Sequence, residues 1–224
     1  MELVLVRHAQ PAWTRDSVAQ VDPTLTALGM RQAEAAARRL ADERFDHVLV
    51  STAQRSQQTA EPLLADRDTP TTSRHWLHEI HLPQAFADTP AEEVGQVLRE
   101  ARHRPREEWW DGLPGGESFR DFHQRVTTGL REELAVFGAT LGPDRLWSVP
   151  DDDLRLLVVA HAGTNSVVLG ALLGLDPEPW EWERFASNHA SITVLRTTAI
   201  AGGHIFGLQC FSDVEHLRPD LVTA

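Results

Sequence analysis

The sequence predicts an α/β protein in which helices cover both faces of a mostly parallel central sheet, a three-layer α/β/α sandwich. Short apolar runs typical of buried strands alternate along the chain with longer segments that have one apolar face at helical spacing. Of the 224 residues, 42% are hydrophobic, which is enough for a sizeable core. Strands that alternate with helices usually pair in parallel and are buried on both faces.

The first third of the chain contains two predicted strand–helix units. Residues 2–6 form a short apolar run suited to a buried strand, and residues 45–50 form a second. Thr26 is a suitable N-cap for a helix that extends to about residue 41. A second helix is expected over residues 53–64.

The middle of the chain is irregular from about residue 75 to 113. We expect one domain over residues 1–224, with a cap-like insertion at about 80–115 that contains a helix over 91–102. Ser118 and Asp121 have the spacing of a capping box, so a long amphipathic helix should begin there.

The last third is predicted to return to the sheet. Residues 143–153 read as a polar loop, and residues 154–160 are the most strongly apolar strand candidate. A helix over 164–173 should follow. Two late strands are expected, over 191–195 and 204–210.

Two histidines directly follow predicted buried strands. His8, preceded by Arg7, comes after the first strand, and His161 comes after the strand over 154–160. In open parallel sheets, ligands bind beyond the carboxyl ends of the strands. We therefore expect His8 and His161 to meet at one site despite their separation in sequence.

Arg7, His8, Arg55, Glu79 and His161 together have the chemistry needed to transfer a phosphoryl group. Arginine side chains match the geometry of phosphoryl oxygens and stay charged. Neutral imidazole is a competent nucleophile. A carboxylic acid protonates a leaving alkoxide and then acts as a base toward water. This set suffices for two-step hydrolysis of a phosphate ester without a metal or another cofactor.

Six sequence blocks resemble those of the histidine phosphatase superfamily, also called the phosphoglycerate mutase-like family. In chain order they are Val-Arg-His-Ala-Gln (6–10), Leu-Thr-Ala-Leu-Gly-Met-Arg-Gln-Ala (25–33), Ser-Thr-Ala-Gln-Arg-Ser-Gln-Gln-Thr-Ala (51–60), Leu-His-Glu-Ile (77–80), Pro-Gly-Gly-Glu-Ser (114–118) and Val-Val-Ala-His-Ala-Gly (158–163). Each block alone is weak evidence, but their order strengthens the resemblance, which implies the same α/β/α fold.

The resemblance also implies roles. His8 would attack phosphorus and form a phosphohistidine, and Glu79 would be the proton donor and then the base. Arg7, Arg55 and His161 would bind the phosphoryl oxygens and stabilise the charge of the transition state. Gln10 would lie close to the phosphate. The family needs no metal and no cofactor for this step.

Three departures from the family pattern stand out. Ala9 and Ala162 replace the usual glycines after the two histidines, which requires negative φ angles and room for a β-carbon. After Glu79 the usual Gly-x-Trp-Glu-Gly continuation is missing, and residues 81–86 read His-Leu-Pro-Gln-Ala-Phe. The position of the acid is therefore less certain than that of the histidines. Glu61 and Glu117 compete for that role, and we interpret them as a helix-surface residue and a structural or rim residue.

The sequence favours a phosphomonoesterase that hydrolyses a small phosphorylated metabolite, and it leaves two alternatives open. One is a cofactor-dependent phosphoglycerate mutase. Such mutases are longer in the insertion and have extra basic residues there, whereas residues 103–111 here contain three acidic residues beside two arginines. The other is a non-catalytic protein that binds a phosphorylated ligand.

Trp109 or Trp110 is a candidate to line the leaving-group pocket. His75, His78 and His81 are spaced by three, but we do not interpret them as a metal site.

Composition restricts the partners. The formal net charge of −12 disfavours nucleic acid and anionic membranes, so the expected partner is a small phosphorylated substrate. The single cysteine cannot form an internal disulfide, and the start of the chain lacks the pattern of a signal peptide. We therefore expect a cytoplasmic protein. The sequence leaves a homodimer open.

Overall fold

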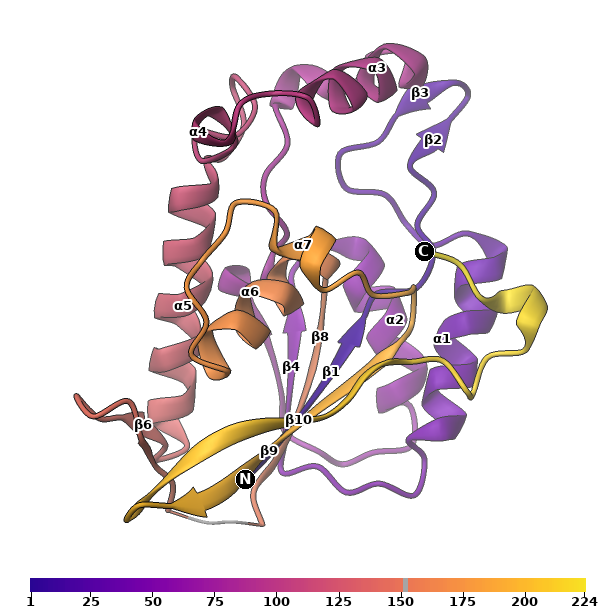
Figure 1. Cartoon of the computed structure of the whole chain (residues 1–224). Coiled ribbons are helices and arrows are strands. Elements are labelled where there is room, and N and C mark those ends of the chain that lie inside the picture. The colour runs from indigo at the N-terminus through magenta and orange to yellow at the C-terminus, as the bar shows by residue number, and fades with distance from the viewer. Residues whose placement is uncertain (151–152) are drawn as a thin grey trace.

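An eight-stranded sheet forms the middle layer of the molecule, described here from a computed structural model over residues 1–150 and 153–224 (Figure 1). The strand order is β5-β4-β8-β1-β9-β10-β7-β6. Four neighbouring strands are parallel: β5 (Thr71–Arg74), β4 (His47–Ser51), β8 (Arg155–Ala160) and β1 (Glu2–Arg7). The other four are joined antiparallel: β9 (Ile192–Ile200), β10 (Gly203–Asp213), β7 (Trp147–Ser148) and β6 (Thr140–Leu141).

Helices cover both faces of the parallel strands, which confirms the predicted three-layer fold. On one face, Leu3 and Leu5 of β1 pack in the same core cluster as α5 (Phe119–Val136) and α6 (Ala162–Leu172). On the other face, Val4 of β1 belongs to a second cluster that includes residues of α2 (Gln54–Leu64) and the end of α1 (Ala27–Arg39). Because successive side chains of a strand point to opposite faces, a continuous apolar run satisfies both layers.

The predicted helix starts in the first two thirds of the chain are confirmed. Thr26 Oγ1 accepts a hydrogen bond from the Gly29 N–H at 2.9 Å and caps α1. Ser118 Oγ accepts from the Asp121 N–H at 3.0 Å and caps α5. The helix expected over 91–102 is α3 (Ala91–Ala101). The starts of α1 and α5 were predictable because a capping side chain acts on its own first turn.

Several boundaries differ from the prediction. Strand β5 was not predicted, because it lies at the edge of the sheet, has a polar sequence and shows no apolar run. The expected loop over 143–153 contains β7, and its residues 151–152 lie outside the described residues. Helix α6 begins two residues early, directly after His161. The late strands β9 and β10 are longer than expected, because their hairpin extends into exposed positions where no apolar pattern is needed.

Residues 80–115 lie beyond the carboxyl ends of the parallel strands (Figure 1). They contain α3, the short α4 (Arg106–Trp109) and a 3₁₀ turn, η2 (Gln84–Phe86). We call this segment the cap. Its contact with the hairpin of β2 (Thr14–Arg15) and β3 (Val18–Ala19) is a backbone one, since the Ala91 N–H donates to Ser17 O at 2.9 Å.

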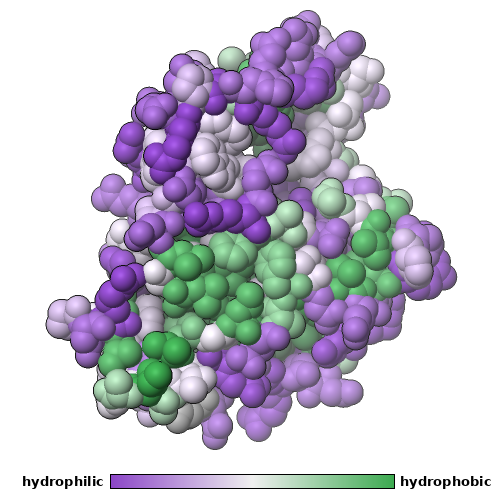
Figure 2. Space-filling view, viewed as in Figure 1, coloured by the Kyte–Doolittle hydropathy of each residue, from purple (hydrophilic) through white to green (hydrophobic). Residues whose placement is uncertain are grey.

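The surface of the cap differs in polarity from that of the part of the molecule below it. The cap is mostly hydrophilic, whereas apolar residues gather below it over α6 and β10 (Figure 2). No helix within residues 1–150 and 153–224 combines the length and the apolar character required to cross a membrane.

The loop after β1 passes so close to α1 that it requires a glycine. A β-carbon at Gly29 would lie 2.2 Å from the carbonyl oxygen of Gln10. We expect Gly29→Ala to lower the free energy of unfolding by about 1–3 kcal/mol, measured by urea denaturation, because this contact cannot be accommodated without moving backbone. Gly95→Ala in α3 is the matched control. Its β-carbon would meet only the mobile end of Arg99, so the better helix propensity of alanine should raise stability by up to about 1 kcal/mol. Equal stability of Gly29→Ala and the native protein would contradict this packing.

Candidate active site

The sheet brings the two predicted histidines together. His8 directly follows β1, His161 directly follows β8, and these strands pair in parallel with Arg7 opposite Ala160. The ring centroids of the two histidines are 5.1 Å apart in an edge-to-face arrangement. His8 is 3% exposed and His161 is fully buried. The rule that parallel strands present their ends on one edge therefore placed this pair correctly.

The ring of His8 is held in one tautomer. Its Nδ1 lies 2.8 Å from the carbonyl oxygen of Ala9, and a carbonyl only accepts, so Nδ1 carries the proton. The lone pair is then on Nε2. Burial, together with the positive charges of Arg55 and Arg7, holds the pKa of His8 well below its usual value of 6.5. His8 is therefore a neutral imidazole with a nucleophilic Nε2.

His161 is fixed by two serines. Its Nε2 lies 2.8 Å from Ser51 Oγ and 3.4 Å from Ser56 Oγ. Burial and the charge of Arg55 hold the pKa of His161 well below 6.5. If Ser51 donates to Nε2, the proton of the neutral ring is on Nδ1, which is a hydrogen-bond donor available to an anion.

Arg55 projects from α2 and is 2% exposed, which is rare for a charged side chain. Its guanidinium donates to Asp22 Oδ1 at 3.4 Å and lies over the ring of Trp13, 5.0 Å from the centroid. Burial lowers its pKa, and the charge of Glu79 opposes that shift. Asp22 is 40% exposed, so it compensates the buried charge only in part.

Arg7 is held by a residue that sequence reasoning did not assign to the site. Its guanidinium donates to Ser187 O and, at 3.1 Å, to Nε2 of the buried His189. His189 Nδ1 then donates to Thr223 Oγ1 at 2.9 Å. Burial and the charge of Arg7 lower the pKa of His189 to about 3, so the ring is neutral and serves as an acceptor for Arg7.

Three buried nitrogen atoms of this cluster have no hydrogen-bond partner among the described residues: Arg7 Nε, Arg55 Nε and His161 Nδ1. Buried polar atoms are normally hydrogen-bonded. Unsatisfied donors on two arginines and a neighbouring imidazole fit an oxyanion such as a phosphoryl group.

The loop after His8 is held by polar residues of two other sequence blocks. The Ala9 N–H donates to Thr59 Oγ1 at 3.0 Å, and the Gln10 N–H donates to Gln32 Oε1 at 2.8 Å. Ala9 is fully buried with a negative φ, so its β-carbon is accommodated. The side chain of Gln10 accepts from Thr26 Oγ1 at 2.8 Å, at the start of α1, and its phosphate-binding role stays a prediction.

Glu79 lies at the same site. Its Oε2 accepts from the Gly163 N–H at 2.9 Å and its Oε1 accepts from the Ile80 N–H at 3.0 Å. A β-carbon at Gly163 would lie 2.4 Å from Oε1, which explains the glycine after Ala162. Glu79 is also close enough to influence the charges of Arg7 and Arg55.

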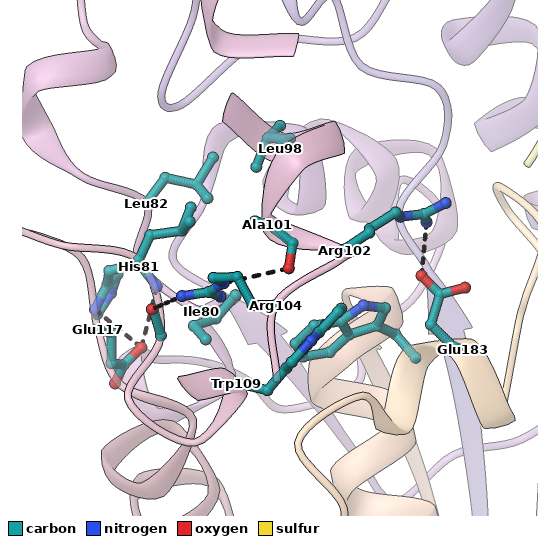
Figure 3. A pocket seen from close by; sticks show the side chains of 13 residues that line it. Ile80, His81, Leu82, Leu98, Ala101, Arg102, Arg104, Trp109, Glu117 and Glu183 are labelled. Atoms are coloured by element: carbon teal, nitrogen blue, oxygen red, sulfur yellow. Dashed lines mark hydrogen bonds and ion pairs between the residues drawn. The ribbon is translucent and has the colours of Figure 1, made fainter. Parts of the chain in front are cut away.

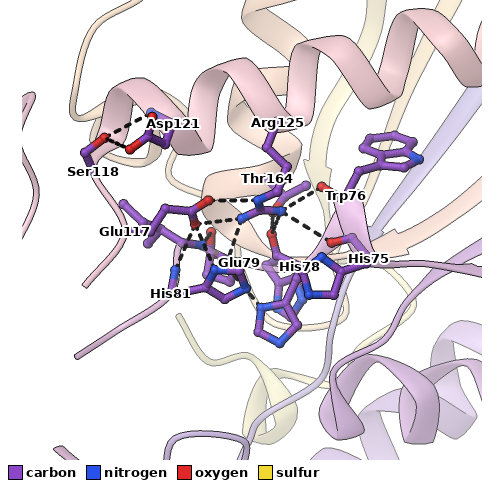
Figure 4. Close-up of polar contacts among 12 residues, drawn as sticks. His75, Trp76, His78, Glu79, His81, Glu117, Ser118, Asp121, Arg125 and Thr164 are labelled. Atoms are coloured by element: carbon purple, nitrogen blue, oxygen red, sulfur yellow. Dashed lines mark hydrogen bonds and ion pairs between the residues drawn. The ribbon is translucent and has the colours of Figure 1, made fainter. Parts of the chain in front are cut away.

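A partly buried ion pair between Arg125 and Glu117 holds the segment that carries Glu79 (Figure 4). Arg125 of α5 donates to the carbonyl oxygens of Trp76 and His78, each at 3.0 Å, and to Glu117 Oε2 at 2.7 Å. Glu117 Oε2 in turn accepts from the His81 N–H at 3.0 Å. Glu117 is therefore structural, as predicted. Arg125 was missed, because a side chain that binds backbone carbonyls leaves no motif of its own.

Of the remaining candidates, His78 lies beside this centre, since its ring centroid is 5.7 Å from that of His161. Glu61 is exposed on α2, in agreement with its interpretation as a surface residue. The rings of His78 and His81 are 4.8 Å apart, and His81 Nδ1 pairs with Glu117 Oε2 at 3.3 Å. Within the part of the chain that the structure describes, no group of three or more histidine, cysteine, aspartate or glutamate residues is arranged to hold a metal ion.

The fold and the site define an α/β protein with a candidate oxyanion site between two buried histidines and two arginines at the carboxyl edge of a parallel sheet. Comparison with known families agrees with this class. Residues 3–201 match the model of the histidine phosphatase superfamily (branch 1). The chain belongs to this superfamily.

Similar proteins include phosphatases and mutases. The adenosylcobalamin/alpha-ribazole phosphatase of Escherichia coli is 28% identical over 216 residues, which are 89% of this chain and 98% of that protein. A 2,3-bisphosphoglycerate-dependent phosphoglycerate mutase of Methylocella silvestris is 32% identical over 183 residues, 79% of this chain and 83% of that protein. The structure of a mycobacterial glucosyl-3-phosphoglycerate phosphatase with VO3 has a TM-score of 0.72 at 25% identity, with 95% of this chain and 99% of that chain covered.

The tautomer and the lowered pKa of His8 are directly testable. We expect ¹⁵N NMR of the histidine rings, assigned by comparison with His8→Asn, to show His8 with a protonated Nδ1 and an unprotonated Nε2 from pH about 8 down to pH about 6. Since the folded-state pKa is lowered, the ring should take up its second proton only in more acidic solution. In the denatured protein the same ring should titrate near pH ~6.5. A titration midpoint near 6.5 in the folded protein would show that the ring is not desolvated.

Proposed function

We propose that this protein is a phosphomonoesterase that hydrolyses a small phosphorylated metabolite through a phosphohistidine at His8. The observation that carries the proposal is a buried, neutral His8 with its lone pair on Nε2, beside His161 and the side chains of Arg7 and the buried Arg55. The phosphatases among its relatives support the same conclusion.

In the proposed mechanism, hydrolysis takes place in two steps. First, His8 Nε2 bonds to phosphorus while the ester P–O bond breaks, and protonated Glu79 gives its proton to the leaving oxygen. Second, a water oxygen bonds to phosphorus, Glu79 accepts a proton from that water, and the N–P bond breaks to release inorganic phosphate. Arg7, Arg55 and His161 hold the phosphoryl oxygens and stabilise the charge that is spread over them in both transition states.

A mutase-type transfer between two hydroxyl groups is the second candidate, because mutases are among the relatives. The charge of the cap favours the phosphatase. Arg102 pairs with Glu183 at 2.6 Å and Arg106 pairs with Glu178 at 2.9 Å, so neither is available to a second phosphate or carboxylate. Release of inorganic phosphate from 3-phosphoglycerate without formation of 2-phosphoglycerate would favour the phosphatase over the mutase.

Loss of the nucleophile tests the proposal. We expect His8→Ala to lower turnover of p-nitrophenyl phosphate by at least about 1,000-fold and to abolish the acid-labile phosphoenzyme seen after a rapid quench with labelled substrate. His103→Ala, which removes an exposed histidine of the cap, is the matched control and should keep both signals. If the native protein shows no turnover between pH about 4 and 9, it is a binding protein instead.

The role of Glu79 as proton donor can be tested by the dependence of the rate on the leaving group. We expect Glu79→Gln to slow hydrolysis of alkyl phosphates by about 100-fold or more but that of p-nitrophenyl phosphate by less than about tenfold, because a good leaving group departs without protonation. Glu61→Gln, on the exposed face of α2, is the control and should change neither rate. Equal losses for both esters would assign the acid to another residue.

A further inference from the structure

A second pocket, distinct from the space above the histidines, opens between the cap and α7 (Glu181–Arg184) (Figure 3). Its volume is about 270 Å³, slightly below the ~300 Å³ at which whole-ligand pockets begin, so it suits one part of a ligand. Its apolar lining comes from Ile80, Leu82, Leu98, Leu113, Trp109 and Trp182. The structure thus places Trp109, rather than Trp110, in a pocket. Trp110 instead packs against Phe119 of the core.

The charged residues of the pocket are already engaged. Arg102 pairs with Glu183, and Glu117 pairs with Arg125. Arg104 donates to the carbonyl oxygens of residues 101 and 112, at 3.2 and 2.6 Å. A second phosphate or carboxylate would have to break these contacts and replace them. An uncharged apolar group would leave them intact and would cover the exposed faces of the tryptophan and leucine side chains.

The pocket adjoins the catalytic cavity. Ile80, His81 and Leu82 line both this pocket and the cavity that contains Arg55 and Glu79. Glu79 is the group that protonates the leaving oxygen in the proposed mechanism. A phosphate ester with its leaving oxygen at Glu79 would therefore have its organic part at residues 80–82, where the pocket begins.

We propose that this pocket binds the organic part of the substrate, and that the preferred substrates are phosphate monoesters of alcohols that carry an apolar, ring-containing group a few bonds from the ester oxygen. The proposal rests on the proposed phosphatase function and specifies its substrate class. It predicts discrimination by the ring of the ester rather than by a second charge.

Two esters with the same reacting atoms isolate this effect. 3-Phenylpropyl phosphate and propyl phosphate have similar alkoxide leaving groups and differ by a phenyl ring. We expect kcat/KM of the native protein to be about 10- to 100-fold higher for the phenyl ester, from burial of the ring. A ratio near one would overturn the proposal while leaving the phosphatase function intact.

Substitution of two neighbouring residues of α3 with nearly equal exposure tests whether the ring binds in this pocket. Leu98 is 39% exposed and lines the pocket, whereas Val97 is 40% exposed and does not. Leu98→Ser should lower the ratio of the two kcat/KM values by about threefold or more, and Trp109→Ala by about tenfold, whereas Val97→Ser should leave the ratio unchanged. An equal effect of Leu98→Ser and Val97→Ser would place the ring elsewhere, and this comparison holds even if Trp109→Ala fails to fold.

A binding measurement tests the pocket independently of the proposed phosphatase activity. Calorimetry with the His8→Ala variant measures the affinity for both esters without turnover. Tighter binding of 3-phenylpropyl phosphate, by about tenfold, supports the pocket even if the native protein hydrolyses neither ester, in which case only the phosphatase function fails. Equal affinity for the two esters would overturn the pocket.

Discussion

The desolvation of Arg7 and Arg55 beside His8 and His161 is the constraint on which the rest of the site depends. Arg7 and Arg55 repel each other, and removal from water disfavours their charge. Their protein partners are only partial: a half-exposed carboxylate for Arg55, and an imidazole and a carbonyl for Arg7. Burial, together with the positive charges of these arginines, lowers the pKa of His8 and of His161 and keeps both rings neutral. In the proposed mechanism, this one arrangement provides both an anion site and a nucleophile, and a bound phosphoryl group would offset its cost in stability.

The scaffold has to hold these groups against that repulsion, and it does so with neutral hydrogen bonds. Thr59 and Gln32 fix the backbone after His8, and Ser51 fixes His161. Thr223, next to the last residue, accepts from both Gln32 and His189. Neutral partners position the cluster without adding negative charge, which would raise the histidine pKa values and weaken the attraction for a substrate anion.

Features of the fold could be predicted from the sequence where their physical cause lies within a short segment of the chain. Apolar runs and capping side chains act on their own segments, so β1, β8 and the starts of α1 and α5 were predictable. Pairing of His8 with His161 followed from a general rule about strand ends. His189 and Arg125 were not predictable, because their roles consist of tertiary contacts with Arg7 and with backbone carbonyls. Edge strand β5 gave no signal, because one side of it faces solvent.

The residues after Glu79 depart most from the family pattern, yet Glu79, the acid of the proposed mechanism, is held firmly in place. Its position does not depend on the residues that follow, because Arg125 holds the backbone before Glu79 and Glu117 holds the N–H of His81 after it. The carboxyl itself is fixed by the N–H groups of Ile80 and Gly163. Each of these bonds has a backbone atom as one partner, so none of them uses the side chains of Ile80 or Leu82. These two side chains are thus free to line the proposed substrate pocket, so substrate preference can change while Glu79 stays in place.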